Sequence, residues 1–268
     1  MNGLMRVLFC SIALLVSAAI AAPAASAKPK KPVHPLQLSL GDSWAFGFGA
    51  SDPSTEGYVP QLHEALAKKR LKKMGLRSVA VPGATTPSMI AGQFPEAIPL
   101  LESRNGNRKK RDDVEVTTLH IGGNDVTNPI IAACLAGITP SCLQVIQAEF
   151  AAYRGDLDTA LSRLRQAAGE EATIVIGTYD NPIATCFLGG VPGAVLLADL
   201  VLEGGGPVPQ GLHDIMRDVA EDYGVGVAEV YGDLGPADWV GGNDCLHPDD
   251  SGYDKVTVAF LEALGLGS

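Results

Sequence analysis

Four short stretches of the sequence hold side chains that could do chemistry together. The first, Gly41-Asp42-Ser43, ends an apolar run and offers a hydroxyl; the second and third are Pro82-Gly83-Ala84-Thr85 and Gly122-Gly123-Asn124-Asp125. The fourth, Asp244-Cys245-Leu246-His247-Pro248, offers an imidazole beside a carboxylate. Hydrolysis of an ester through a serine needs a hydroxyl, a base, a group that orients the base, and donors for the oxyanion. The four stretches contain all of these groups.

Ser43 would be the nucleophile of such a reaction, and His247 its base. Asp244 lies three residues before His247, a spacing that lets a carboxylate and an imidazole lie side by side in one loop and fix the tautomer of the ring. We expect the backbone N–H groups of Ser43 and Gly83, with the side-chain amide of Asn124, to form the oxyanion hole. Gly83 suits this role because a residue without Cβ lets a substrate approach its backbone.

The same residues also have a structural interpretation. Taken alone, Asp42 and Ser43 could do no more than cap backbone groups in a turn after a strand. Asp42 and Asp125 are in any case expected to hold their turns through side-chain-to-backbone hydrogen bonds. His120, which lies close to the site, is expected to be a packed or hydrogen-bonded residue rather than a second base.

Strands and helices that alternate along the chain would position these residues. Apolar, β-branched runs predict strands at residues 36–40, 78–81, 114–121, 173–178 and 225–230. Apolar residues at helical spacing predict helices at residues 58–74, 88–101, 143–168, 212–223 and 257–264. This alternation is typical of a three-layer α/β/α fold with a mainly parallel five-stranded sheet. Because ligands bind at the carboxyl ends of parallel strands, the first three stretches should converge on one edge of the sheet.

In their order, the four stretches resemble the sequence blocks of the GDSL, or SGNH, serine hydrolases. The blocks stand here as GDSWAFG, PGATT, GGND and DCLHP, and they span most of the chain. Trp44 stands where the leucine that gives the family its name would be. The resemblance implies a flavodoxin-like SGNH hydrolase fold, the catalytic and oxyanion roles given above, and neither a cofactor nor a metal ion.

The N-terminus has the parts of a secretory signal peptide at residues 1–27. Arg6 precedes an apolar run, and Ala25-Ser26-Ala27 fits a cleavage site. An uncleaved N-terminal anchor is the alternative. Residues 28–35 form a basic, Pro-rich leader that we expect to be disordered, and residues 36–268 are expected to form a single hydrolase domain. We therefore expect a secreted protein, either extracellular or periplasmic.

Composition and missing motifs limit the partners. The 30 Asp and Glu against 20 Lys and Arg give a formal net charge of −10, which disfavours nucleic acids and anionic membranes. The sequence lacks the zinc motifs C-x-x-C and H-E-x-x-H, the G-x-S-x-G turn of α/β-hydrolases, and the glycine motifs of nucleotide enzymes. We expect a monomer that takes a small-molecule, lipid or glycan ester, without stable insertion into a membrane.

Four cysteines follow the expected signal peptide, and an even number in a secreted chain suggests two disulfides. Cys134 and Cys142 lie in CLAGITPSC, whose glycine and proline favour a turn, so we pair them. Cys186 then pairs with Cys245, because both are expected at the carboxyl edge of the sheet. The alternative is that Cys245 is a free buried thiol and Cys186 a small packed residue.

The sequence says least about the substrate. Residues 186–203 are apolar and follow the fourth strand, and we expect a short helix there whose Leu196 and Leu197 help to hold the acyl chain. Trp44 and Phe46 are further candidate walls, and ordinary core packing is the alternative for all of them. The preferred function is a secreted serine esterase or lipase. The alternatives are a carbohydrate O-deacetylase and a hydrolase-like domain that only binds lipid or glycan.

Overall fold

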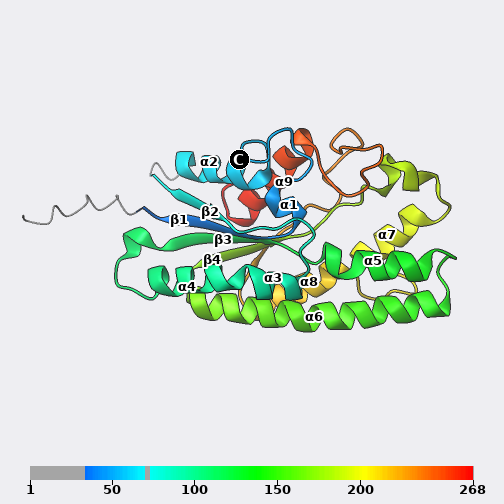
Figure 1. Ribbon diagram of the computed structural model, residues 1–268, viewed down its shortest axis with the longest axis horizontal. Coiled ribbons are helices and arrows are strands. Elements are labelled where there is room, and N and C mark those ends of the chain that lie inside the picture. The colour runs from blue at the N-terminus through cyan, green and yellow to red at the C-terminus, as the bar shows by residue number, and fades with distance from the viewer. Residues whose placement is uncertain (1–33, 70–72, 268) are drawn as a thin grey trace, which may run out of the picture. The chain divides into compact units, whose positions relative to one another are not determined.

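The computed structural model describes residues 34–69 and 73–267. The expected signal peptide, most of the expected leader, and residues 70–72 of the first predicted helix lie outside the described residues. Five strands of the described chain form one sheet (Figure 1), namely β1 (Leu36–Gly41), β2 (Gly75–Ser78), β3 (Val114–His120), β4 (Thr173–Gly177) and β5 (Gly226–Ala228). Neighbouring strands are all parallel, and their order is β2-β1-β3-β4-β5.

The strand order brings two of the reactive stretches to one point of the sheet. From β1 the chain moves outward to β2 and then crosses back to β3, on the other side of β1. In open parallel sheets, ligand sites lie at the carboxyl ends of the strands beside such a reversal. Ser43 follows β1 and Asn124 follows β3, so both belong to this point of the fold.

Helices cover both faces of the sheet, as expected for a three-layer α/β/α fold. On one face lie α2 (Tyr58–Lys69) and α9 (Asp250–Ala263) (Figure 1). The other face carries α3 (Thr86–Gly92), α4 (Phe94–Asn105), α6 (Pro140–Ala168) and α8 (Leu212–Asp222). The remaining elements are α1 (Ser43–Phe46), α5 (Gly123–Cys134), α7 (Ala194–Glu203) and the short 3₁₀ turns η1 (Lys110–Asp112), η2 (Ile183–Thr185) and η3 (Phe187–Gly190).

The two central strands are buried on both faces, which explains why they read as nearly continuous apolar runs. Every residue of β1 is buried, and Leu38 and Leu40 have no exposed surface. Val116 and Leu119 of β3 are equally inaccessible. Burying a leucine or valine side chain contributes about 1.5–3 kcal/mol. The strands that precede Ser43 and Asn124 are therefore firmly held by the core.

Several helices differ from the prediction. α5 was not predicted, since Gly123 and Pro129 both lower helix propensity. Its Val126 and Ile130 are nevertheless buried, and this packing outweighs the propensity. The predicted helix at residues 88–101 is in fact two, α3 and α4. α9 begins at Asp250 rather than at residue 257, because the side chain of Asp249 accepts from the Gly252 N–H and caps the helix there.

The second strand also lies earlier than predicted. Its hydrogen-bonded partners in β1 fix β2 at Gly75–Ser78, with Leu36 opposite Gly75 and Ser39 opposite Ser78. The predicted residues 79–81 continue alongside β1: the Val79 N–H donates to Ser39 O (2.9 Å) and the Val81 N–H donates to Gly41 O (3.0 Å). The apolar run thus marks the end of this edge strand, which leads into the loop of Gly83.

The four cysteines pair as expected in the structure. Cys134 and Cys142 join the end of α5 to the first turn of α6, and their Cα atoms are 4.9 Å apart. Cys186 and Cys245 are joined across 59 residues of sequence, with 5.3 Å between their Cα atoms. Among the helices that the structure describes, none combines the length and the hydropathy needed to cross a bilayer.

Candidate active site

A tight turn after β1 presents Ser43. Gly41 has φ +135°, and a Cβ at this position would lie 2.1 Å from His120 O, so only glycine fits between the two strand ends. The next residue, Asp42, donates its N–H to His120 O (2.9 Å) and caps α1 by accepting from the Trp44 N–H (2.9 Å). Ser43 is therefore the first residue of a short helix, α1, whose start is fixed by the ends of β1 and β3.

Asp42 itself is buried, with 1% of its surface exposed. Its second carboxyl oxygen accepts from the Tyr179 hydroxyl (2.5 Å). Burial raises the pKa of Asp42 to about 7, although the hydrogen bonds from Tyr179 and the Trp44 N–H act to lower it. As expected, the Asp42 side chain holds its turn through a hydrogen bond with the backbone, which is the cap on α1. Its two described partners are the Trp44 N–H and the Tyr179 hydroxyl, and Ser43 is not one of them.

The structure brings Ser43, His247 and Asp244 together as a hydrogen-bonded chain. Ser43 Oγ lies 2.9 Å from His247 Nε2. His247 Nδ1 lies 2.8 Å from Asp244 Oδ2 and 3.1 Å from Asp244 Oδ1. Because a carboxylate only accepts, the proton of neutral His247 belongs on Nδ1, which leaves Nε2 free to accept from the Ser43 hydroxyl. This is the arrangement in which an imidazole can take the proton of a serine.

Asp244 is held by the backbone of its own loop. Its Oδ1 accepts from the N–H groups of Leu246 (2.8 Å) and His247 (3.0 Å), which explains why the D-x-x-H spacing suffices for the pair. Partial burial opposes the ionisation of Asp244. The hydrogen bonds from the His247 ring and from these two N–H groups outweigh it and lower the pKa of the carboxyl below its usual value.

The loop of His247 is fixed from several sides. The disulfide between Cys186 and Cys245 ties it to the chain after β4. The indole N–H of Trp44 donates to Leu246 O (2.9 Å), and the Val240 N–H donates to His247 O (3.2 Å). Trp44 is only 4% exposed, so we correct its expected role. It supports the loop of the base from inside the core rather than forming a wall of the substrate site.

The expected oxyanion donors lie on three loops that contact one another. Gly83 has φ +78°, and no atom lies within 4 Å of the position where a Cβ would be, so its backbone faces open space. The side-chain amide of Asn124 donates to Ala84 O (3.0 Å), which ties the third loop to the second. An amide has two N–H bonds, so one remains for a substrate oxygen. Ser43, at the first position of α1, has no helical acceptor for its N–H.

Asp125 strengthens the same contact. Its two carboxyl oxygens accept from the Thr86 N–H at the start of α3 (2.9 and 3.0 Å), so it holds the loop of Gly83 against the start of α5. Burial raises the pKa of Asp125 to about 6, against the lowering effect of these bonds. His120 is also buried; it packs against Trp44 and lies 2.9 Å from Thr178 O through Nε2. It has the packed, hydrogen-bonded role that the sequence suggested.

The expected acyl walls differ in their surroundings. Phe46, at the end of α1, is 44% exposed. The expected short helix is present as α7, where Leu197 packs partly against the core and Leu196 is 57% exposed. Leu196 lines a shallow hollow of about 430 Å³ together with residues of the loop at 189–193 and Asp199. Ser43 and His247 do not line this hollow, so the described contacts do not join Leu196 to the candidate catalytic residues.

Sequence reasoning missed three residues of the site. Gln93 holds the turn before Ser43 with two hydrogen bonds, accepting from the Gly41 N–H (2.9 Å) and donating to Gly41 O (2.7 Å). Phe48 places its ring 4.6 Å from the ring of His247, between centroids. Tyr179 binds Asp42. Only Phe48 had a signal, since it lies in the glycine-rich stretch after Ser43; the other two are remote in sequence from any motif.

Removing the disulfide beside the base is expected to lower activity more than removing the other one. Replacing Cys186 and Cys245 by alanine frees a loop of 59 residues, which the chain-entropy model values at about 4 kcal/mol, and loosens His247. The matched control replaces Cys134 and Cys142, a bond that does not touch the catalytic loop. We expect a lower kcat in the first variant alone and a lower thermal midpoint in both. Equal kcat values in the two folded variants would show that the bond does not position the base.

Comparison with solved structures shows the same fold in several ester hydrolases. The lipase Lip_vut3 from a goat rumen metagenome has a TM-score of 0.63 and 17% identity, over 87% of this chain and 98% of that one. The extracellular lipase of Streptomyces rimosus has a TM-score of 0.57 and 18% identity, over 87% and 100%. The acetylxylan esterase Axe2 of Geobacillus stearothermophilus has a TM-score of 0.54 and 16% identity, over 87% and 95%. At these identities the likeness concerns the fold alone.

Comparison at the level of sequence is more specific about the family. No curated protein matches the chain. Residues 39–255, however, match the GDSL-like Lipase/Acylhydrolase family. This range includes Ser43, Gly83, Asn124, Asp244 and His247, and it covers well over half of the sequence. The chain therefore belongs to the GDSL-like lipase/acylhydrolase family, whose members hydrolyse esters.

Proposed function

We propose that this protein is a secreted serine esterase or lipase that hydrolyses carboxylic esters of acyl substrates. The observation that carries the proposal is the chain of hydrogen bonds from Ser43 Oγ to His247 Nε2 (2.9 Å) and from His247 Nδ1 to Asp244 Oδ2 (2.8 Å). With all three groups in hydrogen-bond contact, a domain that only binds lipid or glycan is the weaker alternative.

The proposed reaction has two stages. Ser43 Oγ attacks the carbonyl carbon of the ester while His247 Nε2 takes the hydroxyl proton, and the oxyanion accepts from the N–H groups of Ser43 and Gly83 and the amide of Asn124. The intermediate collapses, the alcohol leaves with the proton from His247, and an acyl group remains on Ser43. Water then attacks this acyl-enzyme with His247 again as the base, and the free acid leaves. Asp244 stays ionised and stabilises the protonated imidazole in both stages.

The surroundings of His247 favour an apolar acyl group. Phe48, whose ring lies against His247, is 46% exposed, and Leu246, the residue before His247, is also exposed. Val240 is exposed as well. Val240 Cγ2 and His247 Cβ each lie 3.0 Å from the position that a Cβ on Gly49 would occupy, so the two side chains are close to each other. Exposed apolar side chains gathered around a catalytic group favour contact with a hydrocarbon chain over a polar sugar. This supports an acyl esterase or lipase over the carbohydrate O-deacetylase.

A panel of substrates tests this choice. We expect kcat/KM for p-nitrophenyl esters to rise from the acetate to chains of medium length, because a longer chain covers more of the apolar surface at Phe48, Val240 and Leu246. Acetylated xylan should release little acetate under the same conditions. Preference for acetate together with rapid deacetylation of the polysaccharide would support the O-deacetylase instead.

Turnover of a soluble ester is expected to fall on acidification, because only a neutral imidazole at His247 can accept the Ser43 proton. Asp244 does not cause this loss, since its pKa is lowered and it stays ionised. Two other carboxyls of the site gain protons on the same acidification, because burial raises the pKa of Asp42 to about 7 and that of Asp125 to about 6. If the Asp42→Asn and Asp125→Asn variants both keep the fall in turnover at low pH, that fall belongs to His247. A flat profile in the folded protein would contradict a histidine base.

Export and a monomeric state complete the proposal. Two disulfides are typical of proteins that fold in an oxidising compartment, and a solved structure of the same fold is an extracellular lipase. All of the proposed catalytic and oxyanion groups come from one chain, so a monomer suffices for activity. Fractionation of the producing cells and N-terminal sequencing of the exported form would test both the export and the expected cleavage after Ala27.

A further inference from the structure

Asp42 links Ser43 to a part of the molecule that the proposed chemistry does not use. One carboxyl oxygen of Asp42 caps α1, whose first residue is Ser43. α1 has only four residues, so its own hydrogen bonds are too few to hold its direction. The other carboxyl oxygen accepts from the Tyr179 hydroxyl (2.5 Å). Tyr179 therefore holds the carboxyl that caps the helix carrying the nucleophile.

Tyr179 lies just after β4, between the two loops that carry Ser43 and Asn124. Its ring packs edge-on against Trp44, with 5.2 Å between the ring centroids. On the side of the third loop, a Cβ placed on Gly123 would lie 3.2 Å from Tyr179 Cζ, so the ring lies against the backbone beside Asn124. A single buried side chain thus contacts both the nucleophile loop and the loop of an oxyanion donor.

A buried histidine holds the backbone of Tyr179 in place. The Tyr179 N–H donates to His213 Nε2 (3.1 Å), and His213 has no exposed surface. The other ring nitrogen, Nδ1, lies 2.5 Å from Glu203 Oε1. Because Nε2 accepts, the proton of the neutral ring lies on Nδ1 and is donated to Glu203. Burial lowers the pKa of His213, although Glu203 acts to raise it, so the ring keeps an acceptor for Tyr179.

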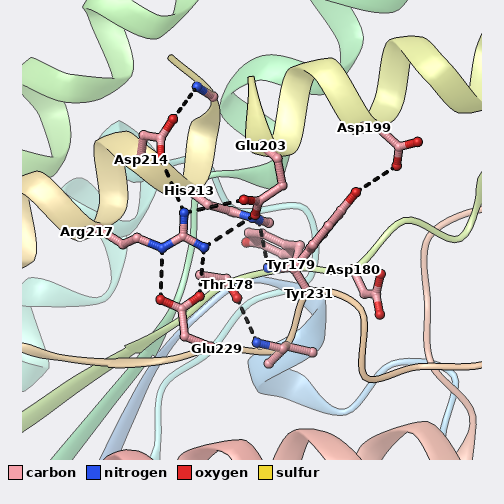
Figure 2. A network of polar contacts seen from close by, with 12 residues as sticks. Thr178, Tyr179, Asp180, Asp199, Glu203, His213, Asp214, Arg217, Glu229 and Tyr231 are labelled. Carbon is pink, nitrogen blue, oxygen red and sulfur yellow. Dashed lines mark hydrogen bonds and ion pairs between the residues drawn. The ribbon is translucent and has the colours of Figure 1, made fainter. Parts of the chain in front are cut away.

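Glu203 is in turn fixed by charge (Figure 2). The guanidinium of Arg217 lies 3.4 and 3.5 Å from the two Glu203 oxygens and donates two shorter bonds to Glu229, of 2.8 and 2.9 Å. Glu203 ends α7, whereas His213 and Arg217 lie on α8 and Glu229 follows β5. The backbone of Tyr179 is thus bonded to α8, whose His213 is held by a residue at the end of α7 that Arg217 links to a residue after β5.

Tyr223 shows what a tyrosine does when it only supports the fold. It follows α8, and its hydroxyl donates to Asp158 Oδ1 (2.7 Å) on α6, away from the loops of the site. The acceptor of Tyr179 is instead a carboxyl whose other oxygen caps the helix of the nucleophile. Losing the Tyr179 hydroxyl would leave that carboxyl without its buried donor and free to turn, whereas losing the Tyr223 hydroxyl leaves the capping of α1 unchanged.

We propose that Tyr179 is a positioning residue of the reaction: its hydroxyl fixes Asp42 and thereby the direction of Ser43, and its backbone is held by the pair formed by His213 and Glu203. The proposal rests on the proposed serine mechanism. The two can fail separately, because turnover by the wild type and its loss in Ser43→Ala test the mechanism without any change at Tyr179.

The test compares Tyr179→Phe with its matched control, Tyr223→Phe, on a soluble ester; both hydroxyls donate to an aspartate. Misplacing a reacting atom by about 1 Å costs up to about 100-fold. We therefore expect kcat to fall about 10- to 100-fold in Tyr179→Phe with KM within about twofold, and the rate at which a fluorophosphonate modifies Ser43 to fall by the same factor. Tyr223→Phe should show no such loss of kcat. A kcat of Tyr179→Phe within about twofold of the control would overturn the proposal.

A double-mutant cycle with Asp42→Asn tests the route through Asp42. Asparagine keeps an oxygen for the Trp44 N–H but replaces the carboxylate that Tyr179 binds. If Tyr179 acts through Asp42, the double variant should lose no more than the worse single variant; losses that multiply would overturn this route. If Tyr179→Phe does not fold, His213→Leu, which removes the acceptor of the Tyr179 N–H, takes its place. The folded His213→Leu protein should show the same fall in kcat, and a kcat within about twofold of the wild type would overturn the proposal.

Discussion

Ser43→Ala is expected to lower kcat for a p-nitrophenyl ester by about 10⁵-fold or more, while the protein stays folded. The hydroxyl is the group that forms the covalent intermediate, and triad members act as a unit, so its loss removes nearly all of the nucleophilic catalysis. The substitution removes one oxygen atom from a half-buried side chain whose only described hydrogen bond is to His247. We therefore expect a thermal midpoint close to that of the wild type.

Ser103→Ala is a suitable control for this experiment. Ser103 is an exposed serine on α4 whose hydroxyl donates to the carbonyl of Leu100 in its own helix. We expect this variant to keep the turnover and the thermal midpoint of the wild type. Turnover close to that of the wild type by pure, folded Ser43→Ala would show that another residue is the nucleophile.

Asn124→Ala should give the second largest effect, a fall in kcat of about 10²–10³-fold with little change in KM. One hydrogen of the Asn124 amide is used by Ala84 O in the free protein, and the other is the one available to the oxyanion. Because the negative charge develops only in the transition state, the donor should matter for kcat and much less for binding. Steady-state kinetics with a soluble ester would measure both parameters.

Two further variants separate the oxyanion role from a structural one. Asn124→Asp keeps the shape of the side chain but can no longer donate from it when ionised, so it should lose at least as much kcat as the alanine variant. Asn128, one turn further along α5, is exposed, and Asn128→Ala should behave like the wild type. A rise in KM at unchanged kcat in Asn124→Ala would make Asn124 a residue that positions the substrate.

The proposed catalytic residues could be identified from the sequence because much of their arrangement is local. Asp244 reaches His247 through a D-x-x-H spacing that needs only one loop, and its carboxylate binds the N–H groups of that same loop. Ser43 and Asn124 follow buried strands, and the rule for parallel sheets brings such loops together. These residues required no knowledge of contacts between side chains distant in sequence.

The supporting residues could not be predicted in this way. Gln93, 52 residues from Gly41, and Tyr179, 137 residues from Asp42, act through single hydrogen bonds that no motif announces. The role of Trp44 stayed open at the level of sequence, because a tryptophan beside the nucleophile is as compatible with a substrate wall as with a buried support. Only the bond from its indole to Leu246, 202 residues away, decides between the two. α5 was missed for a related reason, since packing rather than propensity stabilises it.

The central claim, that Ser43 is the nucleophile of this protein, is tested most directly by covalent labelling. A fluorophosphonate transfers its phosphorus to an activated serine with loss of fluoride, and mass spectrometry of the digested protein locates the adduct. We predict one adduct per chain, on the peptide that contains Ser43, formed in step with the loss of esterase activity and absent from Ser43→Ala. An adduct on a different residue, or complete labelling of Ser43 with the esterase activity unchanged, would contradict the account.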